Sequence, residues 1–328
     1  MTPPMSGALL EVEDLNVWFD LPNGGTLHAV QGVSFSVGTG TRLGMVGESG
    51  CGKTTTILAL MGLLPPTASV SGRISLDGVD LLERGEQTIS PYRWRDIAMV
   101  FQGAMNAFDP VKRIGVQIAE PMGLHDAATG KEATARVREL LELVGIAPDR
   151  ARSYPHELSG GMRQRAAIAM ALACNPRILL ADEPTTALDV MVQAQILELL
   201  TDLSDELGLA LVFVTHDLPI VAQTCTHAAV MYAGRIVEQG ATDALYHETR
   251  HPYTRLLWAA TPDLDSQEDV VSIPGVPPRL DAALHGCPFA PRCDRTAARC
   301  VEEAQELLPV GEGHVSACHF ASSLKVVA

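Results

Sequence analysis

The chain has 328 residues, 47% of them hydrophobic, and its 24 Lys and Arg against 39 Asp and Glu give a formal net charge of −15. This length predicts roughly two domains, or one domain with an appendage. The acidic balance argues against nucleic acid as the main partner, because phosphate backbones attract clustered basic charge. The apolar runs fall short of the roughly 20 residues that cross a bilayer. The opening residues do not resemble a secretory signal, so we expect a cytosolic protein whose seven cysteines are thiols or metal ligands rather than disulfides.

The predicted elements follow a β-rich, then helical, then α/β order along the chain. Alternating or continuous apolar residues predict strands at 9–19, 33–37, 43–46, 177–181, 209–215, 228–232 and 235–239, the last two forming a hairpin. Helical periodicity and good helix formers predict helices at 54–64, 131–144, 160–174 and 191–207. Strands that alternate with helices indicate an α/β fold with a parallel sheet, interrupted by a largely helical insertion. Beyond about residue 262 the chain turns to Pro, Gly and Cys with little periodicity.

Residues 47–54 match the motif G-x-x-x-x-G-K-[ST] between a predicted strand and a predicted helix. In this context the glycines let backbone N–H groups close around phosphates at the positive end of the helix dipole. We expect Lys53 to reach the β and γ phosphates and the Thr54 hydroxyl to hold Mg²⁺. The simpler alternative is a Gly-rich turn with a chance lysine. The residues expected to line this nucleotide site are Gly47, Glu48, Ser49, Gly50, Cys51, Gly52, Lys53, Thr54 and Thr55.

The apolar strand predicted at 177–181 ends in two carboxylates, Asp182 and Glu183. Buried parallel strands direct their C-terminal ends toward a ligand. We expect Asp182 to hold the Mg²⁺ shell and Glu183 to polarise the attacking water, because phosphoryl transfer depends on positioned charge. Taken alone, the pair is also compatible with an acidic helix cap before Pro184.

Residues 158–162 begin a predicted helix with small side chains, which suits phosphate binding at a helix N-terminus. In isolation they are also an ordinary capped helix start. The residues are Leu158, Ser159, Gly160, Gly161 and Met162. With the phosphate loop and the carboxylates, this segment resembles the signature sequence of ATP-binding cassette (ABC) ATPases. The resemblance implies that the segment completes the nucleotide site of a second protomer, so that two cassettes pair head to tail with ATP between them.

Further segments resemble motifs of the same family and occur in the same order. Gln102 resembles the glutamine-loop residue that touches Mg²⁺ and reports to the membrane subunits. His216 resembles the switch histidine that senses the γ-phosphate. The segment that resembles the loop crossing the dimer interface contains Ala187, Leu188 and Asp189.

The aromatic residue expected to stack on adenine is Phe19. Trp18 beside it is the alternative, and a core role for either stays open. Through the resemblance, Mg²⁺ is assigned to Thr54, Gln102 and Asp182. The catalytic residues implied in the same way are Glu183, His216 and Gln102.

Residues 101–110, 181–190 and 251–254 resemble the ATPases of oligopeptide and dipeptide importers, and the resemblance covers about residues 8–320. It implies a P-loop NTPase fold in which the cassette spans 8–260, with a RecA-like core, a β-rich N-terminal subdomain and a helical signature subdomain at about 92–175. A small C-terminal region of the importer type, 261–328, would carry a metal cluster. The glutamine loop departs from the pattern, with Gln-Gly-Ala where an acidic residue and Pro are commoner.

The resemblance also implies partners: a second ABC ATPase subunit, identical or homologous, two transmembrane permease subunits and an extracytoplasmic substrate-binding protein, with no nucleic acid. The chain would lie peripherally on the cytoplasmic face of the cell membrane, and Glu157 would contact a permease. The cargo would be dipeptides or oligopeptides, with nickel, glutathione or another small solute as alternatives. A different class of function is a soluble ABC ATPase that acts on ribosomes or nucleic acid, which the acidic charge and the single cassette oppose.

The C-terminal region contains four cysteines spaced C-x5-C-x6-C-x17-C. A region with so little apolar patterning needs added stability, which a bound metal centre would supply. The tight C-x2-4-C hook usual for zinc is missing. Because the resembling family has iron–sulfur clusters in this tail, we expect a [4Fe-4S] cluster, with Zn²⁺ or disulfides as the alternatives. The expected ligands are Cys287, Cys293, Cys300 and Cys318.

Overall fold

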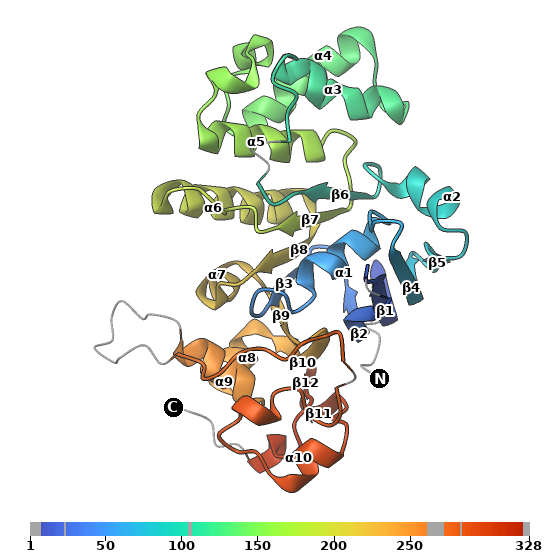
Figure 1. Ribbon diagram of the computed structural model, residues 1–328. Coiled ribbons are helices and arrows are strands. Elements are labelled where there is room, and N and C mark those ends of the chain that lie inside the picture. Colours follow the sequence, from blue (N-terminus) through green and yellow to red (C-terminus); the bar gives the residue numbers. More distant parts are fainter. Residues whose placement is uncertain (1–7, 23, 104–106, 261–271, 283, 324–328) are drawn as a thin grey trace. The chain divides into compact units, whose positions relative to one another are not determined.

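The computed structural model describes residues 8–22, 24–103, 107–260, 272–282 and 284–323 (Figure 1). The chain forms two compact units. One consists of residues 1–83 together with 214–328, and the other of residues 84–213. The units are therefore interleaved along the sequence.

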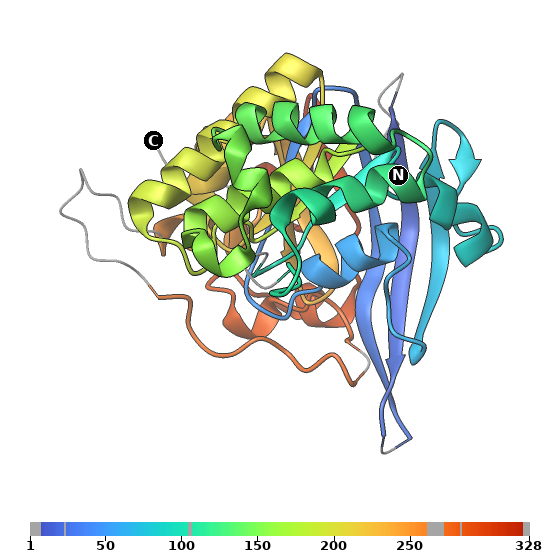
Figure 2. The same ribbon diagram turned by 90° about the horizontal axis from the view of Figure 1, so that it is seen from above.

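The first unit contains a four-stranded antiparallel sheet in the order β2-β1-β4-β5. Its strands are β1 (Leu10–Asp20), β2 (Thr26–Val37), β4 (Ala68–Leu76) and β5 (Val79–Asp80). Figure 2 shows β1 and β2 side by side along their length. Alternating apolar residues of β1 are buried, as expected for a sheet that covers a core with one face.

The same unit contains a second sheet, in which successive neighbours are β11 (Leu308–Gly311), β12 (His314–Ser316), β10 (Arg235–Ala241), β9 (His227–Tyr232) and β3 (Arg42–Val46). The pairing of β3 with β9 is parallel, whereas β9 and β10 form the predicted hairpin. The helices of this unit are α1 (Lys53–Leu60), α7 (Leu218–Thr224), α8 (Thr242–His247), α9 (Pro252–Ala259) and α10 (Ala298–Glu302).

The second unit contains β6 (Ile97–Val100) and β7 (Ile178–Asp182), which pair in parallel and are buried throughout. Strand β8 (Ala210–Thr215) follows β7 in the sheet order and includes residues of both units. The helices are α2 (Glu86–Ile89), α3 (Ile114–Leu124), α4 (Gly130–Leu143), α5 (Gly160–Ala171) and α6 (Val190–Leu207). Continuous apolar sequence explains β6 and β7, because strands covered on both faces do not alternate.

The predicted elements are largely present, but β4, α7, α8 and α9 were not predicted, and three expectations differ from the structure. The helix expected at 54–64 ends at Leu60. The segment expected to be largely helical, 92–175, includes the strand β6, and its longer helices begin only at Ile114. The C-terminal region is more regular than its sequence indicates, because β12 pairs with β10. Among the described residues, none of the helices is both long enough and apolar enough to span a membrane.

Candidate nucleotide site and C-terminal cysteines

The phosphate loop joins β3 to α1 in the first unit. Gly50 and Gly52 have φ angles of 79° and 105°, in the region that favours glycine. A Cβ atom at Gly47 would lie 2.1 Å from the backbone oxygen of Met231, and one at Gly52 would lie 2.6 Å from that of Ala29. Two of the motif glycines are therefore required by contact with neighbouring strands, and the motif is more than a turn with a chance lysine.

Lys53 is 6% exposed, and its ammonium group lies inside the loop. Its Nζ donates to the carbonyl oxygens of Gly47 at 2.7 Å and Glu48 at 3.1 Å. Thr54 is exposed, as are Ser49 and Gly50 at the tip of the loop. The loop therefore presents backbone N–H groups, a hydroxyl and a lysine at a helix N-terminus, the donor set that binds phosphate.

Cys51 is buried within the loop, with its Sγ 3.7 Å from Lys53 Nζ. A helix N-terminus lowers the pKa of a thiol, which would make it reactive. Here burial dominates and raises the pKa of Cys51, with Lys53 acting in the opposite direction. Cys51 is accordingly a packing residue.

The predicted catalytic carboxylate is positioned within the second unit. Asp182 ends β7 and is 1% exposed, and Glu183 follows it with a φ angle of 43°. Glu183 Oε2 accepts hydrogen bonds from Gln102 Nε2 at 2.8 Å and from Thr186 Oγ1 at 3.0 Å. The structure thus brings Gln102 and Glu183 into contact, while their roles at a phosphate stay predictions.

The two predicted dimer motifs are helix N-termini of the same unit. Ser159 caps α5, where its hydroxyl accepts from Met162 N at 3.3 Å, and Asp189 caps α6, where its carboxylate accepts from Val192 N at 3.0 Å. A Cβ at Gly161 would lie 2.7 Å from Val192 Cγ1, so this glycine lets α5 approach α6 closely. Val190 and Met191, at the start of α6, are 78% and 72% exposed.

His216 belongs to the first unit, immediately after β8, and is exposed. The next residue, Asp217, donates its N–H to Thr215 Oγ1 at 3.0 Å and caps α7. This hydrogen-bonded turn sets the backbone direction on both sides of His216.

Trp18 and Phe19 are neighbours on β1, so their side chains leave opposite faces of the sheet. The ring of Trp18 stacks on that of His28, with centroids 4.6 Å apart. Both rings line a cavity of 950 Å³ that is also lined by residues of the C-terminal region. With Trp18 engaged there, Phe19 is the better candidate for the adenine ring.

The four C-terminal cysteines line one small cavity of 20 Å³, together with Phe289, Phe320 and His251. Burial raises the pKa of Cys287 and Cys293, and raises that of Cys318 to about 11. In the described part of the chain, no group of three or more His, Cys, Asp or Glu side chains is arranged to hold a metal ion. The predicted convergence of the cysteines is thus observed, while the metal cluster has no support from their arrangement.

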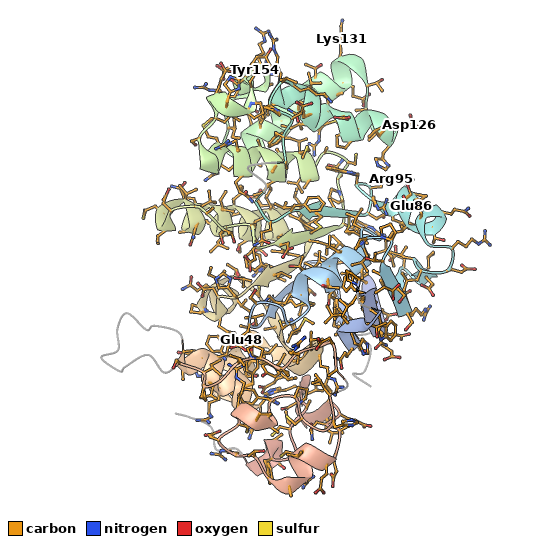
Figure 3. All side chains as sticks on the ribbon, viewed as in Figure 1. Glu48, Glu86, Arg95, Asp126, Lys131 and Tyr154 are labelled. Atoms are coloured by element: carbon orange, nitrogen blue, oxygen red, sulfur yellow. The ribbon has the colours of Figure 1, made fainter. Side chains whose placement is uncertain are left out.

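Two contacts of the phosphate loop were not predicted from the sequence. Glu48, labelled in Figure 3, pairs with Arg292, and its backbone N–H donates to Tyr253 Oη. Tyr253 belongs to the segment 251–254, whose resemblance to importer sequences was the available signal. Arg292 lies between Cys287 and Cys293 in the sequence, and no local pattern there signals a contact with the phosphate loop.

Comparison with known proteins places these motifs in a family context. Residues 30–186 match the family described as ABC transporter, and residues 237–300 match the C-terminal region of oligopeptide and dipeptide transporters. A probable peptide ABC transporter ATP-binding protein of Sinorhizobium fredii is 47% identical over 321 residues, which are 96% of each chain. The oligopeptide transport ATP-binding protein OppD of Escherichia coli is 43% identical over 95% of this chain and 93% of its own length.

A similar solved structure is the dimeric post-hydrolysis state of an ATP-binding cassette bound to ADP and phosphate. It has a TM-score of 0.63 at 28% identity, over 71% of this chain and 98% of that one. The ABC cassette fold of a P-loop NTPase is thereby confirmed.

Proposed function

Because the chain belongs to the family of ATP-binding proteins of oligopeptide and dipeptide ABC transporters, we propose that it binds and hydrolyses ATP to energise a peptide importer. The observation that carries this proposal is the phosphate loop at the β3–α1 junction, in a chain whose similarity to a peptide transporter ATPase extends over 96% of its length.

The motif residues suit magnesium-assisted phosphoryl transfer. Lys53 and the loop amides are donors for the phosphates, and Phe19 is the proposed platform for adenine. Thr54, Gln102 and Asp182 offer hydroxyl, amide and carboxylate oxygens, which are ligands that Mg²⁺ prefers. Mg²⁺ would neutralise the charge that develops on the phosphates.

Glu183 is the proposed base that orients the attacking water. Its hydrogen bonds from Gln102 and Thr186 fix the carboxylate that would orient the attacking water. His216 is proposed to stabilise the reacting geometry at the γ-phosphate. Gln102 would link the site to the membrane partner, since it contacts the catalytic carboxylate.

We propose that two cassettes pair head to tail, the second being identical or homologous to the first. The surface chemistry supports this, because Val190 and Met191 beside the loop 187–189 are large apolar side chains left exposed. Ser159 and the N-terminal amides of α5 would complete the nucleotide site of the partner.

The membrane partners are proposed to be two permease subunits and an extracytoplasmic binding protein, with this chain peripheral on the cytoplasmic face. Phe101, Val111 and Val116 are 43%, 79% and 59% exposed in the segment that follows β6. Apolar side chains of this kind, next to the glutamine loop, suit contact with a permease. Glu157 supplements them at the turn before α5, where it accepts from Tyr154 N at 2.7 Å.

We further propose that the four C-terminal cysteines bind a [4Fe-4S] cluster, with Zn²⁺ as the alternative. Four thiols around one cavity form a donor set that either group uses. The cavity of 20 Å³ admits about one water-sized group, so a cluster requires the thiols to move apart. Anaerobically purified protein should contain iron and acid-labile sulfide and absorb visible light. Colourless protein that contains one zinc ion per chain would contradict the cluster and support Zn²⁺ instead.

The Glu183→Gln variant tests the proposed chemistry. Glutamine keeps the shape and can still hydrogen-bond to Gln102, but it cannot act as a base. We expect ATP binding to be retained and turnover to fall by about a hundredfold or more. Undiminished ATP hydrolysis in this variant would remove Glu183 from its role.

A further inference from the structure

The phosphate loop carries an acidic side chain, Glu48, that is held from two sides by the C-terminal part of the chain. Its carboxylate accepts two hydrogen bonds from Arg292, at 2.6 Å from Nη1 and 2.9 Å from Nη2. Its backbone N–H donates to Tyr253 Oη at 2.9 Å. Both partners lie more than 200 positions away in the sequence, so the loop is tied to distant segments of the chain within the same compact unit.

Arg292 is itself held in place on all sides. Its side chain is 4% exposed, and its Nε donates to the carbonyl oxygen of Pro274 at 2.7 Å. Nη1 also donates to Tyr232 Oη at 3.1 Å, and the guanidinium lies over the rings of Tyr232 and Phe289. A planar guanidinium with these contacts has one orientation, which it imposes on Glu48 through the paired hydrogen bonds.

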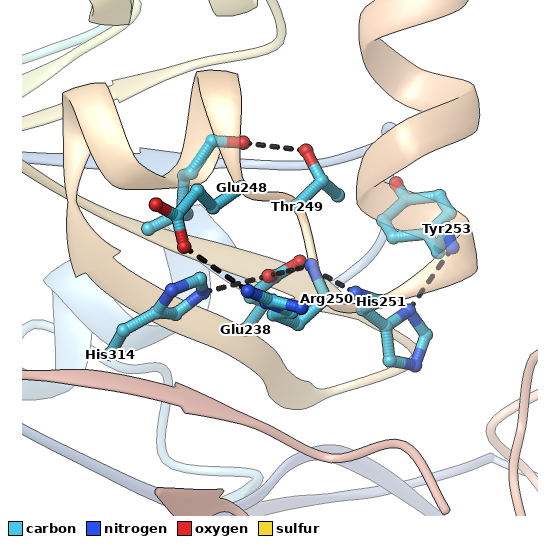
Figure 4. Close-up of polar contacts among 8 residues, drawn as sticks. Glu238, Glu248, Thr249, Arg250, His251, Tyr253 and His314 are labelled. Atoms are coloured by element: carbon cyan, nitrogen blue, oxygen red, sulfur yellow. Dashed lines mark hydrogen bonds and ion pairs between the residues drawn. The ribbon is translucent and has the colours of Figure 1, made fainter. Parts of the chain in front are cut away.

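Tyr253 is equally fixed. Its ring is fully buried, with centroids 4.6 Å from Tyr232 and 5.3 Å from Phe289. Its backbone N–H donates to His251 Nδ1 at 3.1 Å, and the N–H of His251 donates to the buried carboxylate of Glu238 at 3.0 Å (Figure 4). The hydroxyl that receives the Glu48 N–H is therefore part of a rigid cluster.

These contacts neutralise a negative charge that would otherwise lie beside the phosphates of a bound nucleotide. An unpaired carboxylate beside bound phosphates would repel them, because like charges in a partly buried site are weakly screened. Arg292 neutralises the carboxylate and keeps it turned toward the C-terminal region. Tyr253 holds the peptide group that begins the loop.

We propose that Arg292 and Tyr253 are positioning residues for nucleotide binding, which hold Glu48 so that the phosphate loop remains open to an anionic ligand. The proposal rests on the proposed function, since it presumes that the loop binds a nucleotide. It assigns to the C-terminal region a part in nucleotide affinity, in addition to any part in binding a metal.

The test measures the dissociation constant of MgADP by isothermal titration calorimetry on the full-length chain, because MgADP occupies the loop without being consumed. The variants are Arg292→Gln, the double variant Arg292→Gln with Glu48→Gln, and Tyr253→Phe. Arg279→Gln is the matched control, because Arg279 makes a similar paired contact to Asp281 and is 86% exposed.

For Arg292→Gln we expect the dissociation constant to rise on the order of tenfold, as for other coupled charge pairs. The double variant should recover most of the affinity, because the repelling charge is gone, which a merely structural role would not do. Arg279→Gln should stay within about twofold of the unmodified chain. Unchanged affinity in Arg292→Gln, or a loss that the double variant fails to recover, overturns the proposal.

If Arg292→Gln fails to fold, Tyr253→Phe decides, because it removes one hydroxyl and leaves the ring packing intact. A rise in the dissociation constant of about threefold or more is expected from the lost hydrogen bond, and an unchanged constant overturns the proposal. An unmodified chain that does not bind MgADP would instead overturn the proposed function.

Discussion

Replacing Gly52 by alanine tests whether the phosphate loop approaches the backbone of β2 closely. Gly52 combines a φ angle of 105° with a position where a Cβ would lie 2.6 Å from the backbone oxygen of Ala29. A non-glycine residue at such a φ angle costs about 1–3 kcal/mol. The clash must be relieved by moving the backbone of β2 at Ala29, which is buried, and this adds about 1–3 kcal/mol by analogy with overpacked cores. We therefore expect Gly52→Ala to lower the free energy of unfolding by about 2–6 kcal/mol, the sum of the two costs.

Gly50→Ala is the matched control, because Gly50 has a φ angle of 79° and open space where a Cβ would lie. It incurs only the backbone cost of about 1–3 kcal/mol, partly offset by reduced freedom of the unfolded chain. Urea unfolding of both variants without nucleotide measures the difference. Equal stability of the two variants would refute the close approach of the loop to β2.

Three further predictions follow from individual residues. Burial lowers the pKa of His251 to about 3 from its usual 6.5. Because the pKa of His251 is lower in the folded than in the unfolded chain, the free energy of unfolding is highest above pH 6.5 and falls as the pH decreases toward 3. His251→Asn should therefore flatten the pH dependence of the free energy of unfolding, measured with urea between pH 6 and 4, by up to about 1.4 kcal/mol per pH unit. An unchanged slope would contradict this prediction. Ser159→Ala should cost about 1 kcal/mol through the lost cap and abolish ATP-dependent dimerisation in light scattering, whereas Ser159→Thr should preserve the dimer; dimers in both variants would argue against the role of Ser159. Cys300→Ala should abolish iron binding in metal analysis, while Cys174→Ala, at a half-buried thiol outside the C-terminal cavity, should leave it unchanged.

The phosphate loop, the carboxylates and the signature could be predicted because each is a short segment whose chemistry depends on neighbouring residues. Helix α4 was predicted because its apolar residues recur at helical spacing, and β7 because its short apolar run ends in two carboxylates. Strand β6 was missed because its four apolar residues are too few to distinguish a strand from a helical segment. Strand β12 was missed because its register with β10 is set by tertiary contact.

The contacts of Glu48 lay outside the reach of sequence reasoning for a different reason. Arg292 is 244 positions from Glu48, and no local pattern of charge or spacing connects them. The sequence predicted catalytic roles for both Gln102 and Glu183, but it did not predict the hydrogen bond between them, because the residues are 81 positions apart. Function could be read from local motifs, whereas the way in which the fold holds those motifs required the structure.

The most direct test of the central claim is ATP hydrolysis by this chain when it is assembled with the proposed permease subunits and binding protein in lipid vesicles. We predict that added oligopeptide accelerates hydrolysis, that labelled peptide crosses the membrane in step with it, and that Glu183→Gln abolishes both. Hydrolysis that is indifferent to peptide and permeases, or peptide transport that persists in Glu183→Gln, would contradict the account.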